Sequence, residues 1–240
     1  MRNYLLLLAA AGCSRPAPPP ESSMAVSDQI DTRGEPSDTG WRPLLDESAA
    51  AWRGYRSDRL PAGWQVVDGA LTRVAKAGDI VTREQFQDFE LTLEWKVAPG
   101  GNSGVFYRVI EAPELKWPWQ SGPEAQVLDD AGHRDGARPE TSAGACYGLY
   151  PVPRGVARPA GEWNEMQIVV QGSHVEHWLN GRRVVAYELG SAEWEERVGR
   201  SKFADLPSYG RATRGHIALQ DHGDWVAYRN IRIRDAAPRP

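Results

Sequence analysis

Residues 89–97 read Phe89-Glu90-Leu91-Thr92-Leu93-Glu94-Trp95-Lys96-Val97, and this stretch decides the fold class. Every second residue is apolar, and the residues between them are polar or charged. A repeat of two is the period of a β-strand that buries one face and leaves the other in water. The stretch therefore predicts a strand packed on one side against a hydrophobic core.

Further short apolar runs lie on both sides of this strand, at residues 64–72, 166–170, 174–187, 215–220 and 225–234. The first contains Asp68-Gly69 and the third contains Asn180-Gly181. Both dipeptides accept the positive φ angles of a two-residue hairpin turn. The chain from residue 41 onward is therefore predicted to consist mainly of short antiparallel strands.

Only one segment favours a helix. Ser191 can cap a turn in which Glu193, Glu195 and Glu196 suit the positive end of a helix dipole. Many strands with hairpin turns and one short helix indicate an all-β, two-sheet sandwich.

The first residues have the composition of an export signal. A charged start, an apolar run and small residues precede Cys13, and the run is too short to span a bilayer. Residues 1–12 are therefore interpreted as a lipoprotein signal, with cleavage before Cys13 and lipidation of its thiol. A plain secretory signal is the alternative. The expected location is the cell envelope, on a periplasmic or outer-membrane face, with membrane contact only through the anchor.

Residues 13–39 contain four closely spaced prolines and little periodic apolar content, so we predict a disordered linker that starts at the lipidated Cys13. Residues 40–236 form the predicted folded domain. The net charge of −4 leaves no basic excess for nucleic acid. If Cys13 is acylated, Cys146 is the only remaining thiol and no intramolecular disulfide can form.

Residues 122–129 are the first candidate for chemistry. Alternation places Ala125 and Val127 on one face of a strand and Glu124 and Gln126 on the other. If the apolar pair faces the core, the polar pair lies on an exposed sheet surface. A carboxylate and an amide there can contact sugar hydroxyls, and the carboxylate can move a proton. A solvated strand face is the alternative.

Residues 215–224 repeat this pattern. Ile217 and Leu219 point one way and Gln220 points the other, with Asp221 and His222 in the following turn. An imidazole beside a carboxylate suits acid–base work, although a simple hairpin corner explains the same residues.

Asn102, Phe106 and Arg108 are expected on a common strand face, where Arg108 could bind an anionic group. A packed Phe and a surface Arg are the alternative. His174 and His177 are three apart on a strand and face opposite sides, which disfavours a shared metal ion. Trp117 and Trp119 are interpreted as an exposed loop pair that could form a subsite wall.

Seven ordered blocks of this sequence resemble the 3-keto-disaccharide hydrolase domain family. The blocks are Asp88-Phe89-Glu90-Leu91, Gly100-Gly101-Asn102-Ser103-Gly104-Val105, Gly122-Pro123-Glu124, Gln126-Val127-Leu128-Asp129, Gly161-Glu162-Trp163-Asn164, His177-Trp178-Leu179-Asn180-Gly181 and Leu219-Gln220-Asp221-His222-Gly223. The resemblance implies a concanavalin A-like jelly roll. It also implies cleavage of glycosides whose sugar a partner enzyme, a glucoside 3-dehydrogenase, has oxidised at C3.

The implied reaction needs a base near C2, a donor for the enolate oxygen and an acid for the leaving group. We expect Glu124 or His133 to take the C2 proton and His222 to protonate the departing oxygen. Substrate would be held by Asn102, Arg108, Gln126, Asp129, Tyr147, Gln220 and Asp221. A divalent metal ion could stabilise the enolate, but its ligands cannot be named from the sequence. A non-catalytic carbohydrate-binding lipoprotein is the main alternative, and a structural or protein-binding envelope lipoprotein is the third.

Overall fold

The computed structural model describes residues 40–237. The predicted signal (1–12), the lipidation site Cys13 and the predicted linker (13–39) lie outside these residues and stay predictions. Within residues 40–237, no helix has both the length and the apolar character that crossing a bilayer requires.

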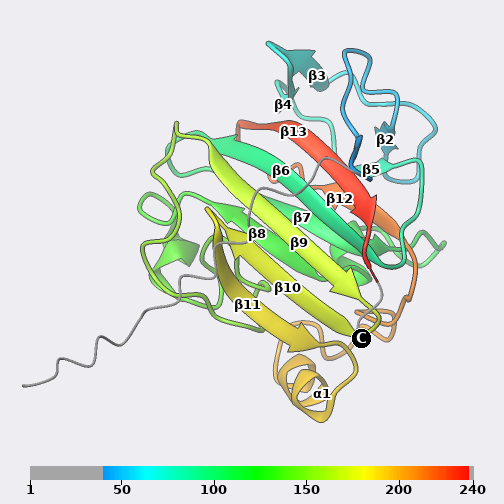
Figure 1. Ribbon diagram of the computed structural model, residues 1–240, viewed down its shortest axis with the longest axis vertical. Coiled ribbons are helices and arrows are strands. Elements are labelled where there is room, and N and C mark those ends of the chain that lie inside the picture. The colour runs from blue at the N-terminus through cyan, green and yellow to red at the C-terminus, as the bar shows by residue number, and fades with distance from the viewer. Residues whose placement is uncertain (1–39, 238–240) are drawn as a thin grey trace, which may run out of the picture. The chain divides into compact units, whose positions relative to one another are not determined.

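Two antiparallel sheets pack against each other (Figure 1). The eight-stranded sheet has the order β11 (Arg182–Glu188), β10 (His174–Leu179), β9 (Asn164–Gln171), β6 (Phe89–Val97), β13 (Val226–Asp235), β4 (Ala70–Arg73), β3 (Trp64–Val67), with β1 (Arg42–Pro43) paired to β13. The five-stranded sheet has the order β2 (Trp52–Gly54), β5 (Ile80–Thr82), β12 (His216–Leu219), β7 (Asn102–Val109), β8 (Glu124–Leu128). The helical elements are η1 (Pro118–Gln120), η2 (Arg134–Ala137) and α1 (Ala192–Gly199). The predicted two-sheet sandwich with one short α-helix is confirmed.

Strand β6 occupies the predicted residues and lies between β9 and β13. Phe89, Leu91, Leu93 and Trp95 are each at most 2% exposed and belong to the core between the sheets. The polar residues between them are directed to the outer face, where Glu94 pairs with Arg229 at 2.6 Å. The period-two prediction is therefore confirmed at this strand.

Both predicted hairpins form with the expected backbone. Asp68 and Gly69 join β3 to β4 with φ angles of 50° and 74°, and Asn180 and Gly181 join β10 to β11 with φ angles of 49° and 77°. Positive φ at both central residues matches the right-handed twist of the paired strands.

Helix α1 begins where the sequence predicts. The Ser191 hydroxyl accepts a hydrogen bond from the Trp194 N–H at 3.1 Å, which satisfies a donor of the first turn. The helix packs below the end of β11 (Figure 1), with Trp194 and Val198 as its buried residues.

A stack of aromatic rings fastens α1 and the loop that follows it to the sandwich. The Trp194 ring lies 5.2 Å from that of Tyr187 on β11 and 5.8 Å from that of Tyr209. The Phe203 ring continues the stack at 4.1 Å from Tyr209, and Tyr150 lies 4.7 Å from Tyr187 on the other side. All four contacts are stacked, and such ring pairs contribute about 0.5–1.5 kcal/mol beyond their burial.

The outer face of the five-stranded sheet is covered. Val81, Phe106, Val109 and Ala218 form a small buried cluster there, apart from the main core. The half-buried rings of Tyr55 and Trp119 pack over this cluster, while Trp117 is 51% exposed. Trp117 and Trp119 therefore differ in burial, and the prediction that both are exposed is correct only for Trp117.

Trp194→Ala should lower the free energy of unfolding by about 3–5 kcal/mol, because it removes the central ring of the aromatic stack and leaves a cavity. Urea unfolding followed by circular dichroism measures this change. Trp117→Ala is the matched control and should change stability by less than about 1 kcal/mol, because its ring is half exposed. Equal losses in the two variants would contradict the proposed role of the stack.

Candidate functional site

A segment of loop pairs with the free edge of β8. The Gln126 N–H donates to the Ala145 carbonyl at 3.0 Å, and the Gly144 N–H donates to the Gln126 carbonyl at 2.8 Å. The Tyr147 N–H donates to the Glu124 carbonyl at 3.1 Å. These bonds make residues 144–147 act as an additional strand, and they place Tyr147 beside Glu124.

All five residues of β8 are buried as a result. Ala125 and Val127 face the main core as predicted. The expectation that Glu124 and Gln126 lie on an exposed sheet surface is wrong: they are 6% and 0% exposed. The sequence alternation gave the correct faces, but it could not show that loops cover the outer one.

The Glu124 carboxyl lies above Gly104 on the neighbouring strand β7. A Cβ atom on residue 104 would collide with the Glu124 carboxyl, so glycine is required there to make room for it. Within residues 40–237 no group donates a hydrogen bond to this carboxyl. Burial raises the pKa of Glu124 to about 8. The positive charge of Lys202 opposes this rise, and the negative charges of Asp79 and Asp135 add to it.

Asp79 is a second, partly buried acid near the site that the sequence did not indicate. It precedes β5, whose Ile80 pairs with Leu219 of β12, so Asp79 lies alongside Gln220. Its carboxylate accepts a hydrogen bond from the Asp221 N–H at 2.8 Å. Burial raises the pKa of Asp79 to about 6, and this hydrogen bond partly opposes the shift.

Lys202, also missed from the sequence, provides a cation at the site. Its Nζ atom lies 4.2 Å from the centre of the Tyr147 ring and 5.7 Å from that of Trp119. Loss of water around it lowers the pKa of Lys202, and the charges of Glu124 and Asp135 oppose that shift. Lys202 lies in the loop that follows α1. Its position at the site depends on how this loop folds, so no local sequence motif indicates it.

His133 and His222 come together across two loops. Their ring centres are 6.4 Å apart and the rings are nearly perpendicular. The Nδ1 atom of His133 accepts a hydrogen bond from the Asp135 N–H at 3.1 Å, and the Asp135 carboxylate accepts one from the Tyr147 hydroxyl at 3.0 Å. His133 is thereby linked to the residue beside Glu124. With Nδ1 as acceptor, the proton of the neutral ring resides on Nε2.

His222 is the more accessible of the two imidazoles, with 48% of its side chain exposed. Its Nδ1 atom lies 3.7 Å from the nearest carboxylate oxygen of Asp224, which also accepts a hydrogen bond from the Asn102 N–H at 3.1 Å. The predicted partner of His222, Asp221, is therefore replaced by Asp224.

Gln220 carries an orphan acceptor. Its backbone N–H donates to the Gly104 carbonyl at 3.0 Å, which places Gln220 next to the glycine beneath Glu124. Its side-chain oxygen is buried and has no hydrogen-bond partner in the described part of the chain. A buried acceptor without a donor costs about 1–3 kcal/mol, so a hydroxyl that donates to it gains that energy.

The structure does not place Arg108 with Glu124, His133 and His222. Arg108 has a φ angle of 53° and lies at an irregularity in the pairing of β7 with β12, which ends the alternation on which the prediction rested. Its guanidinium donates to the Gln87 carbonyl at 3.0 Å and to the Gly172 carbonyl at 2.7 Å, and it pairs with Asp88. Arg108 therefore ties loops together at the other end of the strand.

Asp129 and Asp221 also have their carboxylates occupied by the protein. Asp129 accepts hydrogen bonds from the N–H groups of Gly100 and Ala131. Asp221 accepts from the N–H groups at positions 77 and 78, at 2.7 and 2.8 Å, and pairs with Arg73 at 2.6 Å. Both residues shape the loops around the site, and neither offers a free oxygen to a sugar.

Gln126 and Asn102 are both buried. The Gln126 amide donates to the Thr141 carbonyl at 3.4 Å and accepts from the Val127 N–H at 3.2 Å, so the fully buried side chain supports the covering loop. Asn102 is 4% exposed and stands at the start of β7.

No set of three or more His, Cys, Asp or Glu side chains within residues 40–237 is arranged to hold a metal ion. His177 is fully buried and contacts Tyr107 at 3.0 Å, while the partly exposed His174 contacts Glu188 at 2.7 Å. The two imidazoles therefore have separate environments, as their spacing on a strand predicts.

The two-sheet sandwich, with a buried carboxyl group on one sheet and two imidazoles in the loops nearby, defines a jelly-roll protein of the class that includes glycoside hydrolases. Within that class, the chain belongs to the family of 3-keto-alpha-glucoside-1,2-lyase-like domains, whose model matches residues 40–234. The family resemblance inferred from seven sequence blocks is confirmed.

Individual relatives agree with this assignment. The chain is 34% identical to a 3-keto-disaccharide hydrolase of Bacteroides thetaiotaomicron, over 76% of this chain and 73% of that protein. A crystal structure of a candidate glycosyl hydrolase from Parabacteroides distasonis has a TM-score of 0.77 at 32% identity, covering 82% of this chain and 94% of that one. A Bacillus subtilis protein with a galectin-like fold, at 14% identity and a TM-score of 0.50 over 84% and 97% of the two chains, shares the fold alone.

Glu124 should make the stability of the protein depend on pH. Its folded-state pKa of about 8 exceeds the ordinary 4.5, so its contribution is fully present below about pH 4.5 and is lost as pH rises through 8. The advantage of Glu124→Gln over the wild type should therefore grow from pH 5 to pH 8.5 and then level off, by an amount on the order of 4 kcal/mol. Melting temperatures across this range measure it, with Glu47→Gln on the surface as control. A difference that does not vary with pH would contradict the burial of an ionisable carboxyl.

Proposed function

We propose that this protein cleaves 3-keto-glycosides by removing the C2 proton, eliminating the C1 substituent and adding water to the product. The observation that carries the proposal is Glu124, a buried carboxyl above Gly104 with no hydrogen-bond donor in the described chain. The 3-keto-disaccharide hydrolase named among the relatives supports the substrate class.

The chemistry balances without an oxidant or reductant. The C3 ketone acidifies the C2–H bond, and a base that takes this proton leaves an enolate. The enolate electrons then form the C1–C2 double bond while the C1–O bond breaks, and the departing oxygen takes up a proton. Water adds across the resulting enone, so the products are a 3-keto sugar and an alcohol.

The sequence left Glu124 and His133 as candidates for the base, and Glu124 is the better one. Its raised pKa makes its ionised form a stronger base than an ordinary carboxylate. The Nδ1 atom of His133 already accepts a hydrogen bond from the protein, and its Nε2 atom carries the proton. His133 is therefore suited to donate a hydrogen bond to the substrate, and Glu124 to remove the proton.

Lys202 is the group suited to stabilise negative charge, since the Tyr147 hydroxyl already donates its proton to Asp135. The Lys202 ammonium interacts electrostatically with Glu124 and lies over the Tyr147 ring, so it is near the place where the enolate develops. Trp119 offers an aromatic face beside them for the apolar side of a sugar ring. A divalent ion could share this task, although no set of three or more His, Cys, Asp or Glu side chains within residues 40–237 is arranged to hold one.

His222 is proposed to protonate the leaving oxygen. Its side chain is half exposed, faces His133 and lies beside the Asp224 carboxylate. An imidazole near neutral pH can give a proton and regain it from solvent. Gln220, with its orphan oxygen, would accept a hydrogen bond from a ring hydroxyl.

The substrate must be supplied by an enzyme that oxidises the C3 hydroxyl of a glucoside, and we propose a glucoside 3-dehydrogenase as that partner. A lipid anchor at Cys13 and a location in the cell envelope remain proposals carried by residues 1–13 alone.

Glu124→Gln should reduce turnover of 3-keto-trehalose by at least about a hundredfold, because the amide cannot accept the C2 proton. In the wild type, kcat/KM should rise with pH and level off above about 8, where Glu124 is ionised. Stopped-time product assays across pH 6–9.5 measure both effects, with Glu84→Gln on the surface as control. If Glu124→Gln retains the wild-type rate, the role of Glu124 is wrong, and sugar binding without any product would favour a carbohydrate-binding module.

His222→Ala should slow substrates according to their leaving group. An alkyl aglycone needs a proton to depart, so its turnover should fall by about a hundredfold or more. A nitrophenyl aglycone leaves as a stable anion and should be affected by less than about fivefold. Rates of methyl and nitrophenyl 3-keto-glucosides compare the two cases, and equal losses would rule out His222 as the general acid.

A further inference from the structure

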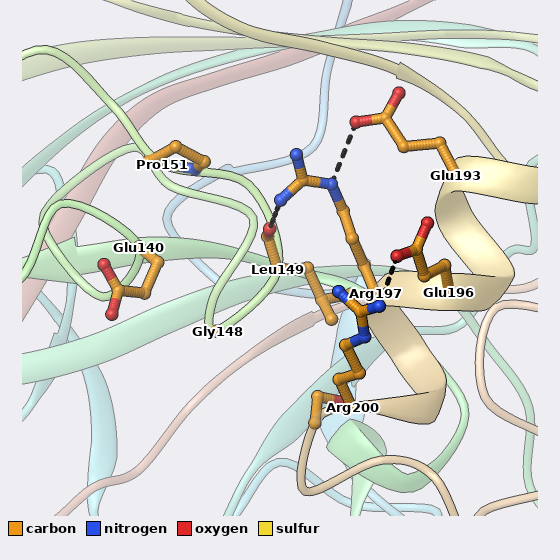
Figure 2. Close-up of a pocket in the computed structure, with 9 residues that line it drawn as sticks. Glu140, Gly148, Leu149, Pro151, Glu193, Glu196, Arg197 and Arg200 are labelled. Carbon is orange, nitrogen blue, oxygen red and sulfur yellow. Dashed lines mark hydrogen bonds and ion pairs between the residues drawn. The ribbon is translucent and has the colours of Figure 1, made fainter.

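A cavity lies between α1 and the loop that follows Tyr147 (Figure 2). Its volume is about 440 Å³, which is within the usual size range of small-ligand pockets. The lining residues are Glu140, Gly148, Leu149, Pro151, Glu193, Glu196, Arg197, Arg200 and Ser201.

Two peptide bonds join the walls of this cavity to the candidate site. Gly148 in the wall directly follows Tyr147, and Ser201 in the wall directly precedes Lys202. Tyr147 and Lys202 contact each other, with 4.2 Å between Nζ and the ring centre. The cavity wall is therefore one residue away along the chain from Tyr147 and Lys202, the two residues that lie beside Glu124.

The walls of the cavity are held in place by the fold. The Arg197 guanidinium donates to the Leu149 carbonyl at 2.8 Å and to the Glu193 carboxylate at 2.9 Å, which connects α1 to the opposite wall (Figure 2). It also lies 4.5 Å from the ring centre of Tyr150, within the aromatic stack. This side of the cavity is therefore preformed, and a ligand need not order it.

The polar groups of the cavity suit a neutral, polyhydroxylated ligand. Arg200 pairs with Glu196 at 2.6 Å on the helix side, and Glu140 is part of the lining on the loop side (Figure 2). Within residues 40–237, no group hydrogen-bonds the Glu140 carboxyl. Three carboxylates and two guanidinium groups nearly balance in charge, so both donors and acceptors are present without a strong preference for an ion.

We propose that this cavity is the subsite for the leaving-group sugar of a disaccharide substrate. The inference rests on the proposed function, in which the oxidised ring lies over Glu124. Its C1 substituent must then extend beyond that ring, and the cavity past Tyr147 and Lys202 has the size and the hydrogen-bonding groups for a second ring.

The test compares two substrates that share the oxidised ring. 3-Keto-trehalose carries a glucose leaving group, and methyl 3-keto-α-glucoside carries only a methyl group. The double variant Glu140→Ala/Arg200→Ala removes exposed or half-exposed side chains on opposite sides of the cavity. It should raise KM for 3-keto-trehalose about tenfold and leave kcat/KM for the methyl glycoside within twofold. Arg42→Ala/Glu84→Ala, which removes an exposed arginine and an exposed glutamate away from the cavity, should change neither.

A second variant, Pro151→Trp, tests the volume instead of the polar groups. Filling the cavity with an indole should weaken cleavage of 3-keto-trehalose in the same selective way, and circular dichroism checks that the fold is kept. Equal effects of the cavity variants on both substrates, or no effect on either, would overturn the subsite.

The failure of the proposed function gives a different result. If the wild type cleaves neither substrate, the proposed reaction is wrong. Calorimetric titration with unoxidised trehalose then tests whether the cavity binds a sugar, independently of the reaction. Weaker binding by Glu140→Ala/Arg200→Ala than by the wild type supports a sugar site there, and equal binding or none overturns it.

Discussion

The pairing of residues 144–147 with the free edge of β8 is the contact on which the rest of the site depends. It gives β8 a hydrogen-bonded neighbour on both sides, and it buries Glu124 in a place where a sheet would otherwise meet water. The same three hydrogen bonds set Tyr147 beside Glu124 and start the turn that forms one wall of the neighbouring cavity. Without this pairing, the carboxyl would be an ordinary solvated side chain.

Burial of an ionisable group is costly, and the surroundings of Glu124 show how the fold accommodates it. Gly104 has no Cβ atom and so leaves space for the carboxyl. Lys202 supplies a positive charge from a loop far along the sequence. Neighbouring acids at positions 79 and 135 act in the opposite sense and favour the protonated form. Such a local conflict between polarity and burial is typical of a site that is kept for chemistry.

The local elements could be predicted from the sequence because their signals are local. The alternation in β6, the Asn180-Gly181 turn and the Ser191 cap each depend on a few neighbouring residues. The cover over β8 could not be predicted, since residues 138–150 have no periodic pattern and act through backbone bonds.

The site was predicted only in part for the same reason. Glu124 and His222 stand in sequence blocks that marked them, His133 follows one of these blocks, and the structure gathers the three in one region. Asp79 and Lys202 arrive from segments without a motif. Arg108 was misplaced because a single positive φ angle reversed its side chain, and strand alternation holds only while the strand stays regular.

Strand β13 is the last strand along residues 40–237, yet it lies in the interior of its sheet, between β6 and β4. The larger sheet therefore stays divided into two halves until the carboxyl-terminal part of the chain has been synthesised. Partners so distant in sequence make folding slow compared with that of proteins built from local contacts. A nascent chain of this protein contains Glu124 before the sandwich can close, so the closed surroundings of this carboxyl are acquired only at the end of folding.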